Sequence, residues 1–291
     1  MSEHPVSRAL APWTTKSECY WMFVTLKSLP KGMYGEVERK GWDESGGEFK
    51  GGLGCVMVVR YRETPVGSYD ELMIIPGNFT VPQPASRPPK IPKKALRIAR
   101  IYVSQRTTTY NGRLNWNIPK HLARFSFSAP PTPAGSSPPE SLTIKVFPPG
   151  TIDGDGRGPF FAATLQPFRW IPSIPVSTNW LPLSTTQVQP PLPQAPGFGN
   201  AVKEVVGGKK VDDYDINPKE EDSLLVGTNE WCAFPIQSYA PRARGCWVTI
   251  HEPGEDLEDA REYWQHVKPW NIGAWMEDAE MVIPAPLTWK L

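Results

Sequence analysis

The fold and function of this 291-residue chain turn on one segment, Tyr110-Asn111-Gly112-Arg113-Leu114-Asn115-Trp116-Asn117-Ile118-Pro119-Lys120-His121-Leu122-Ala123. It opens with a turn-like glycine and continues through alternating polar and apolar residues. Ile118 precedes a proline and is therefore expected to be extended. Pro119 itself suits the first position of a short helical turn. The segment thus predicts that Lys120 lies where a strand gives way to a turn.

The surroundings of Lys120 are apolar, since Ile118, Leu122 and Phe125 flank it. A lysine held among apolar neighbours loses solvation, which disfavours the ammonium form and lowers the pKa. A neutral amine at working pH is a nucleophile towards ketones and aldehydes. Most lysines, however, are solvated surface residues. The residues alone therefore leave a catalytic and a surface lysine both open.

A family resemblance favours the catalytic reading. Gly112-Arg113, followed by Pro119-Lys120 and Leu122-Ala123, resembles the active-site segment of acetoacetate decarboxylase. In that family the lysine after the proline forms a Schiff base with the substrate ketone. The resemblance implies the same role for Lys120, without a cofactor or a metal.

A second segment, Thr64-Pro65-Val66-Gly67-Ser68-Tyr69-Asp70-Glu71-Leu72, resembles the Gly-x-Tyr-x-Glu strand of the same family. The glutamate of that strand lies in the family's active site, which implies a catalytic role for Glu71. The two segments cover roughly residues 55–128, and weaker likeness extends beyond them. The proline-rich middle of the chain and the wording Asn115-Trp116-Asn117-Ile118 look most like fungal-type members.

The strand pattern around Glu71 supports this interpretation only in part. If Tyr69 to Ile75 is a strand, its period of two places Tyr69, Glu71, Met73 and Ile75 on one face. A carboxylate on that apolar face is either exposed at an edge or buried for a purpose. A buried one could shuttle protons. The residue pattern alone favours a surface position for Glu71, whereas the family resemblance favours a position in the active site.

Four further residues are predicted to bind substrate: Arg113, Tyr69, Trp116 and His121. Arg113 has the donor geometry for a carboxylate, although a structural ion pair explains it equally well. His121 stands where better-known decarboxylases carry a second lysine. It is either a surface residue or a group that changes charge near neutral pH.

The chain also departs from the family pattern. The second active-site carboxylate of the decarboxylases falls at about Val56 in this chain. The N-terminal arginine that holds the substrate carboxylate has no clear counterpart in Lys16-Ser17-Glu18-Cys19. A pocket with fewer polar groups suits a substrate that is larger and less charged than acetoacetate.

The composition predicts the fold class. The chain has 34 prolines and 24 glycines that separate short apolar runs, as in β-rich proteins with long ordered loops. We expect one α+β domain over residues 1–291, mainly β, with a curved antiparallel sheet closing into a barrel or cone and a few peripheral helices. Proline-rich insertions are expected at about 82–94, 129–140 and 172–218. The sequence predicts one helix, Glu255 to Val267, and several strands: Tyr20–Leu26, Gly52–Tyr61, Tyr69–Ile75, Ala99–Val103, Arg124–Ser128, Leu142–Phe147, Phe160–Trp170, Trp231–Ser238 and Cys246–Ile250.

Charge and motifs exclude several function classes. The 31 basic and 30 acidic residues give a net charge of +1, which does not indicate nucleic-acid binding. No stretch has the apolar length of a membrane span, and the N-terminus does not resemble a signal peptide. The four cysteines show no metal-binding spacing. We expect a cytoplasmic protein, with a homo-oligomer left open.

Three hypotheses follow for the function. The first is a lyase of secondary metabolism whose Lys120 forms an imine with a β-keto acid or a polyketide-like carbonyl compound. The reaction would then be decarboxylation, or aldol and dehydration chemistry. The second is a cyclase or isomerase that binds such a compound without a covalent bond. The third is a ligand-binding protein without chemistry.

Overall fold

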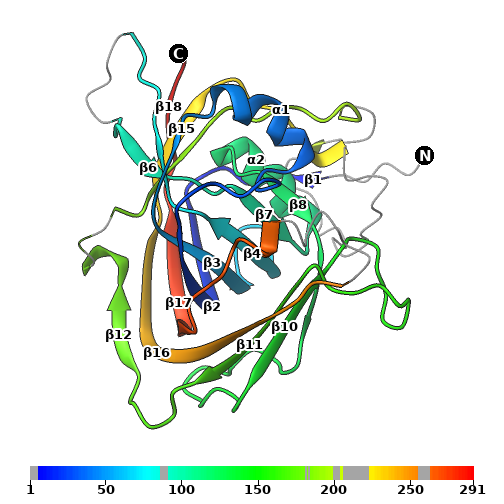
Figure 1. The fold of residues 1–291 in the computed structure, drawn as a ribbon, viewed down its shortest axis with the longest axis vertical. Helices are drawn as coiled ribbons and strands as arrows, with labels where there is room; N and C mark the ends of the chain where they lie inside the picture. Colours follow the sequence, from blue (N-terminus) through cyan, green and yellow to red (C-terminus); the bar gives the residue numbers. More distant parts are fainter. Residues whose placement is uncertain are drawn as a thin grey trace.

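The computed structural model describes residues 6–85, 91–180, 182, 184–198, 204–205, 223–254 and 263–291. These residues form mainly β-structure, with a large curved sheet of 16 strands, a two-stranded sheet and two α-helices (Figure 1). The large sheet curls strongly but is not closed by hydrogen bonds. Neither described helix is long and apolar enough to cross a membrane.

The elements follow in chain order. The first half contains β1 (Val6–Ser7), β2 (Trp13–Leu26), α1 (Glu36–Ser45), β3 (Phe49–Glu63), β4 (Tyr69–Ile75), β5 (Asn78–Thr80), β6 (Lys94–Leu96), β7 (Arg100–Val103), α2 (Arg106–Trp116), β8 (Lys120–Leu122), β9 (Arg124–Phe127) and β10 (Leu142–Phe147). The second half contains β11 (Phe161–Pro167), β12 (Ile174–Ser177), the 3₁₀ turn η1 (Thr178–Trp180), β13 (Thr186–Gln189), β14 (Glu204–Val205), β15 (Trp231–Pro235), β16 (Gln237–His251), β17 (Ile272–Ile283) and β18 (Leu287–Trp289).

The predicted strands are present, and two of them, β4 and β10, have the predicted bounds. The others differ mainly at their ends: the first begins earlier, at Trp13, and the last lies inside the longer β16. Most neighbouring strands are antiparallel, as expected. Within the large sheet, however, β6 pairs with β13 and β7 pairs with β8 in parallel. The β7–β8 pair is parallel because α2 carries the chain back between them, as a crossover helix does.

The prediction for the segment that contains Lys120 was wrong in two details. Residues 110–116 belong to helix α2 and do not form a turn followed by an alternating strand. The helix ends at Asn117, whose φ of 53° is left-handed. Pro119 does not open a helical turn either, because strand β8 begins at the very next residue, Lys120. Three threonines, two asparagines and a glycine are weak helix formers, so burial of nearly the whole helix overrides local preference.

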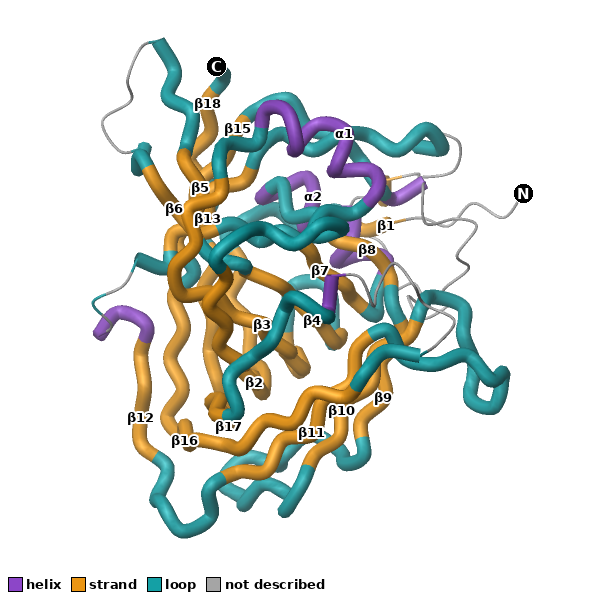
Figure 2. The backbone as a smooth tube through the Cα atoms, viewed as in Figure 1, coloured by secondary structure: helices purple, strands orange, loops and turns teal. Residues whose placement is uncertain are grey.

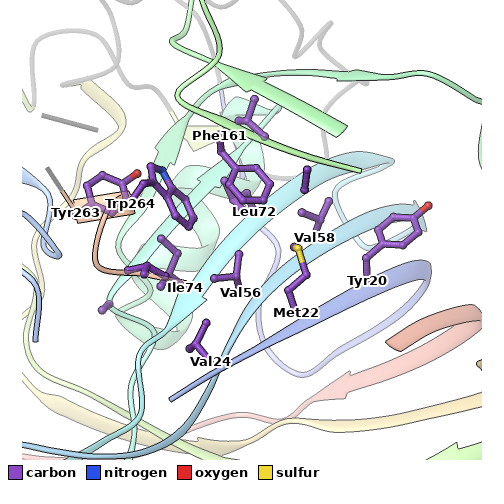
Figure 3. Close-up of a cluster of buried hydrophobic side chains, with 14 of the residues drawn as sticks. Tyr20, Met22, Val24, Val56, Val58, Leu72, Ile74, Phe161, Tyr263 and Trp264 are labelled. Atoms are coloured by element: carbon purple, nitrogen blue, oxygen red, sulfur yellow. The ribbon is translucent and has the colours of Figure 1, made fainter. Parts of the chain in front are cut away.

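The sheet separates two apolar cores. On one face of β2–β4, side chains pack against β10, β11 and the segment at Trp264 (Figure 3). Figure 3 shows Val56, Val58 and Leu72 on this face. On the other face, the sheet packs against α2, β15 and the first part of β16. In Figures 1 and 2 the two helices lie together at the end of the sheet near β7 and β8.

The predicted helix Glu255 to Val267 lies largely outside the described residues. Its last residues are described, and Trp264 and Val267 are buried in the first core. The tract predicted as an insertion, 172–218, contributes β12 and β13 to the large sheet where it is described. Where the predicted loop at 82–94 is described, at 82–85 and 91–93, it has no helix or strand, and β6 begins at Lys94.

One buried carboxylate holds Thr132, in the loop at 129–140, against the sheet. Glu18 of β2 accepts hydrogen bonds from the backbone N–H of Thr132 at 2.9 Å and from its hydroxyl at 2.6 Å. It also accepts one from the indole N–H of Trp275 at 2.7 Å. Glu18 is 1% exposed. The carboxylate therefore joins a proline-rich loop to two central strands.

Replacing Glu18 with Ala removes this acceptor and leaves buried donors without a partner. We expect the free energy of unfolding to fall by about 3 kcal/mol, since each unsatisfied buried group costs about 1–3 kcal/mol. Urea denaturation measures the loss, and limited proteolysis at 129–140 reports release of the loop. Glu63→Ala is the control, because Glu63 forms only an exposed ion pair with Lys16. Equal stabilities of the two variants would contradict the anchoring role.

Candidate active site

The β7–α2–β8 unit places Lys120 in the sheet beside β4. Lys120 lies opposite Ile101 of β7, and Ile101 lies opposite Met73 of β4. Since side chains alternate between faces, Lys120 and Glu71 point to the same side, into the second core. The predicted proximity of the two residues is therefore present.

Three oxygen atoms surround the Lys120 amine. Its Nζ donates to Glu71 Oε2 at 2.9 Å, to the Thr108 hydroxyl at 2.8 Å and, more weakly, to the Tyr69 hydroxyl at 3.4 Å. Lys120 is 3% exposed and Glu71 is 2% exposed. The three contacts match the three N–H donors of an ammonium group.

Gly112 of α2 makes room for the lysine side chain. A Cβ atom at this position would lie 2.7 Å from both Cδ and Cε of Lys120. Any larger residue would therefore push the lysine stem away from the helix. The spacing between Gly112 and Lys120 thus reflects direct packing of the lysine side chain on the glycine. The sequence alone had instead predicted a turn at Gly112.

Burial sets the electrostatics of the site. Loss of water lowers the pKa of Lys120, while the charge and the hydrogen bond of Glu71 act in the opposite direction. Burial also raises the pKa of Tyr61 and Tyr69, and the charge of Glu71 raises both further. The two phenols thus stay protonated. Tyr61 donates to Glu71 Oε1 at 3.2 Å, so Glu71 lies between a phenol and an amine, where it can take up a proton from the amine.

The amine faces a cavity of about 20 Å³. Its walls are formed by one lysine, one carboxylate and mainly apolar or aromatic side chains, namely Trp13, Tyr61, Tyr69, Glu71, Met73, Ile98, Ile101, Trp116, Ile118, Lys120, Ile236, Met281 and Ile283. This volume holds about one water molecule. The cavity must therefore widen before an organic substrate reaches Lys120.

Tyr69 and Trp116 lie in the cavity wall, as two of the four predicted substrate contacts. Trp116 is fixed by an edge-to-face contact with Trp13 at 5.1 Å and by donating its indole N–H to the carbonyl of Pro284 at 2.7 Å. The ring is therefore a rigid wall.

Arg113 and His121 lie away from this cavity. Arg113 donates to Glu38 Oε1 at 2.9 Å and to the carbonyls of Val226 and Pro193. His121 points to the other face of β8, where its Nε2 lies 3.0 Å from Glu38 Oε2. The structure thus joins these two residues through a buried carboxylate of α1 and not through the amine.

Two residues of the site, Tyr61 and Thr108, were not predicted. Tyr61 lies directly opposite Tyr69 in the β3–β4 hairpin, so hairpin register could have found it. No sequence signal indicated Thr108, because the helix that carries it was not predicted. Val56, the expected position of a second carboxylate, points into the first core. Its neighbours on the site's face, Met57 and Val59, are apolar, and Glu71 is the sole acidic side chain among the described cavity-lining residues.

Glu38 is the charge that holds α1, α2 and β8 together. Burial alone would raise its pKa, but the charges and hydrogen bonds of His121 and Arg113 lower the pKa to about 2. A carboxyl group with a depressed pKa stabilises the folded state above its unfolded pKa of about 4.3. That stabilisation is lost as the pH falls from there towards the folded value.

Replacing Glu38 with Gln is expected to lower the free energy of unfolding by about 3–5 kcal/mol at pH 7, because Arg113 stays buried without its counter-charge. The difference between native protein and variant should shrink as the pH falls below about 4. Urea denaturation between pH 7 and pH 2.5 measures it. A difference that is constant with pH would show that the Glu38 charge is not responsible. Glu36→Gln, on the first turn of the same helix, is the control.

Comparisons with known proteins identify the fold. No family model matches the sequence, and no curated protein matches it significantly. Among solved structures, acetoacetate decarboxylase from Legionella pneumophila subsp. pneumophila strain Philadelphia 1 superposes with a TM-score of 0.54 at 10% identity, over 97% of this chain and 89% of the other. An acetoacetate decarboxylase-like enzyme from Sphingomonas wittichii RW1 gives 0.55 at 11% identity, over 97% and 94%.

A third structure, the enduracididine biosynthesis enzyme MppR in complex with the condensation product of pyruvate and imidazole 4-carboxaldehyde, gives a TM-score of 0.50 at 11% identity, over 99% of this chain and 97% of the other. All three matches cover nearly the whole of both chains. The identities are low, so the comparison concerns the arrangement of the backbone. The chain has the acetoacetate decarboxylase-like fold.

Proposed function

We propose that the protein is a cofactor-independent lyase in which Lys120 forms a Schiff base with a keto compound. One observation carries the proposal. The amine of a buried lysine lies in a closed, mainly apolar cavity and donates to a carboxylate at 2.9 Å. Desolvation favours its neutral form, and Glu71 is placed to accept the proton that must leave. The acetoacetate decarboxylase-like fold adds support.

The reaction begins when Lys120 transfers a proton to Glu71 and the amine attacks the carbonyl carbon of the substrate. The neutral amine and the carbonyl form a carbinolamine. Glu71 returns its proton to the carbinolamine hydroxyl, which leaves as water and gives a protonated imine that withdraws electrons from the α carbon. With a β-keto acid, the bond to the carboxylate breaks, CO₂ leaves, and the electron pair remains as an enamine. A proton from solvent, passed on by Glu71, then adds to the α carbon. Hydrolysis by water releases the ketone and the free amine.

The other residues of the site have distinct roles in this mechanism. Thr108 and Tyr69 hold the nitrogen through the proton transfers, and Tyr61 hydrogen-bonds the second oxygen of Glu71. Trp116 limits where the substrate lies. Arg113 and His121 act at a distance, by fixing α1 and α2 around β8 through Glu38. We assign them positioning roles and not contact with the substrate.

The substrate follows from what the cavity lacks. The described residues that line it include no arginine that would bind a carboxylate of the substrate. A larger and less charged keto compound, such as a polyketide-like intermediate of secondary metabolism, suits such walls. Carbon–carbon bond formation with dehydration is open to the same imine, and MppR was solved with a condensation product of pyruvate.

A second candidate function, non-covalent cyclisation or isomerisation, is favoured by the three acceptors around the amine. They suit a charged ammonium group, whose weak contact with the Tyr69 hydroxyl at 3.4 Å would be exchanged for a substrate carbonyl oxygen. In that case the amine would stay charged and the rigid aromatic walls would shape the reacting chain. The two candidates differ in whether a covalent adduct forms.

Borohydride reduction in the presence of a ketone tests for the adduct. With 2-heptanone as the probe, native protein should gain one heptyl group in intact mass, and peptide mapping should locate it at Lys120. Lys120→Met and Lys120→Arg should gain none, because neither side chain can form an imine. Lys290→Met is the control, since Lys290 is an exposed lysine. Full turnover by Lys120→Met would refute the Schiff base and favour the non-covalent candidate.

Glu71→Gln separates two effects of the carboxylate, namely proton transfer and stabilisation of the Lys120 ammonium form. Loss of proton transfer should lower kcat about 10²- to 10⁴-fold. The variant also loses the charge that stabilises the ammonium form, so the pKa of Lys120 should fall further. Adduct formation requires the neutral amine and therefore rises with pH through that pKa. The pH profile of borohydride trapping should thus shift to lower pH in Glu71→Gln. A shift to higher pH would contradict the assigned role of Glu71.

A further inference from the structure

A larger chamber adjoins the cavity at Lys120 on the same face of the sheet. Its volume is about 250 Å³. The walls carry no formal charge; they consist of Trp21, Phe23, Leu53, Gly54, Cys55, Met57, Met73, Ile75, Asn78, Leu96, Thr178, Ser184, Thr185, Gln187, Ile236, Ser238 and Met281. Leu53 at its edge is 38% exposed, so the chamber extends from the surface towards the site.

Three residues belong to the walls of both spaces: Met73, Met281 and Ile236. Met73 follows Glu71 by two positions on β4, which places the shared wall about 7 Å from the carboxylate along the strand. Tyr61, which hydrogen-bonds Glu71, also lies 3.8 Å from the Met281 sulfur. Methionine side chains are unbranched and adapt their shape readily. Two of the three side chains in the partition between chamber and site, Met73 and Met281, are thus of an adaptable type.

We propose that this chamber binds the remote part of the substrate, an uncharged and mainly apolar chain. The reactive carbonyl reaches Lys120 between Met73, Met281 and Ile236, which close the cavity when the site is empty. The proposal rests on the function proposed above and adds the substrate class to it. An ionised group does not suit the chamber, because burying a charge without a partner is costly.

Binding of 2-pentanone, 2-heptanone and 2-nonanone tests whether the chamber binds an apolar substrate chain. Calorimetry is done on native protein and on Lys120→Met, which keeps the bulk of the lysine but cannot form an imine. Each added methylene group should tighten binding up to about fourfold, so Kd should fall at least tenfold across the series in both proteins. An unchanged Kd across the series in both proteins overturns the proposal.

Cys55→Phe tests the location, because this residue lines the chamber and not the cavity at Lys120. The added ring should occupy the space of the chain and abolish the dependence on chain length. Lys145→Phe, at the exposed position of β10, is the matched control and should keep the chain-length dependence. A chain-length dependence that survives Cys55→Phe in the folded variant, as judged by circular dichroism, overturns the assigned location.

Failure of the Schiff base would look different: binding would depend on chain length and on Cys55, but borohydride would trap no adduct.

Discussion

The close packing of the Lys120 stem against Gly112 is the constraint on which the site depends. Gly112 has no side chain, and a Cβ at this position would lie 2.7 Å from Cδ and Cε of Lys120. Because this space is left open, helix α2 approaches β8 closely enough for Thr108 to reach the amine. The same approach buries the lysine and excludes water, which lowers its pKa. The sequence of α2 has a low helix propensity, and its burial against β8 and the sheet stabilises it as a helix.

This packing needs support from outside the sheet, and Glu38 provides it. Its carboxylate accepts a hydrogen bond from Arg113 of α2, and its Oε2 lies 3.0 Å from Nε2 of His121 in β8. The elements that flank Lys120 are thus joined by charges on the face opposite to its amine. The two carboxylates therefore belong to separate networks: Glu38 joins structural elements, and Glu71 contacts the amine. Both of the motif residues that do not contact the cavity, Arg113 and His121, belong to the structural network.

Much of the sheet could be predicted from the sequence, because strand alternation is local information. The bounds of β4 and β10 and the shared face of Tyr69, Glu71 and Met73 follow from the period of two. Helix α2 could not be predicted in this way, since its helicity comes from burial and not from its threonines. The role of Thr108 was hidden with it. The pairing of Arg113 and His121 with Glu38 depends on contacts between residues more than 70 positions apart, which one sequence does not reveal.

A site that excludes water well enough to lower the pKa of a lysine also excludes its substrate. The cavity at the amine holds about one water molecule, so desolvation and access oppose each other. In the proposed mechanism, the partition methionines resolve this conflict, because they fill space when the site is empty and adapt their shape when a chain arrives. Substrate atoms would then replace the side chains that excluded water, and the amine would stay desolvated. A partition of branched residues alone would keep the pKa low but would block entry, which is the physical reason for proposing that Met73 and Met281 act beside Ile236 in substrate entry.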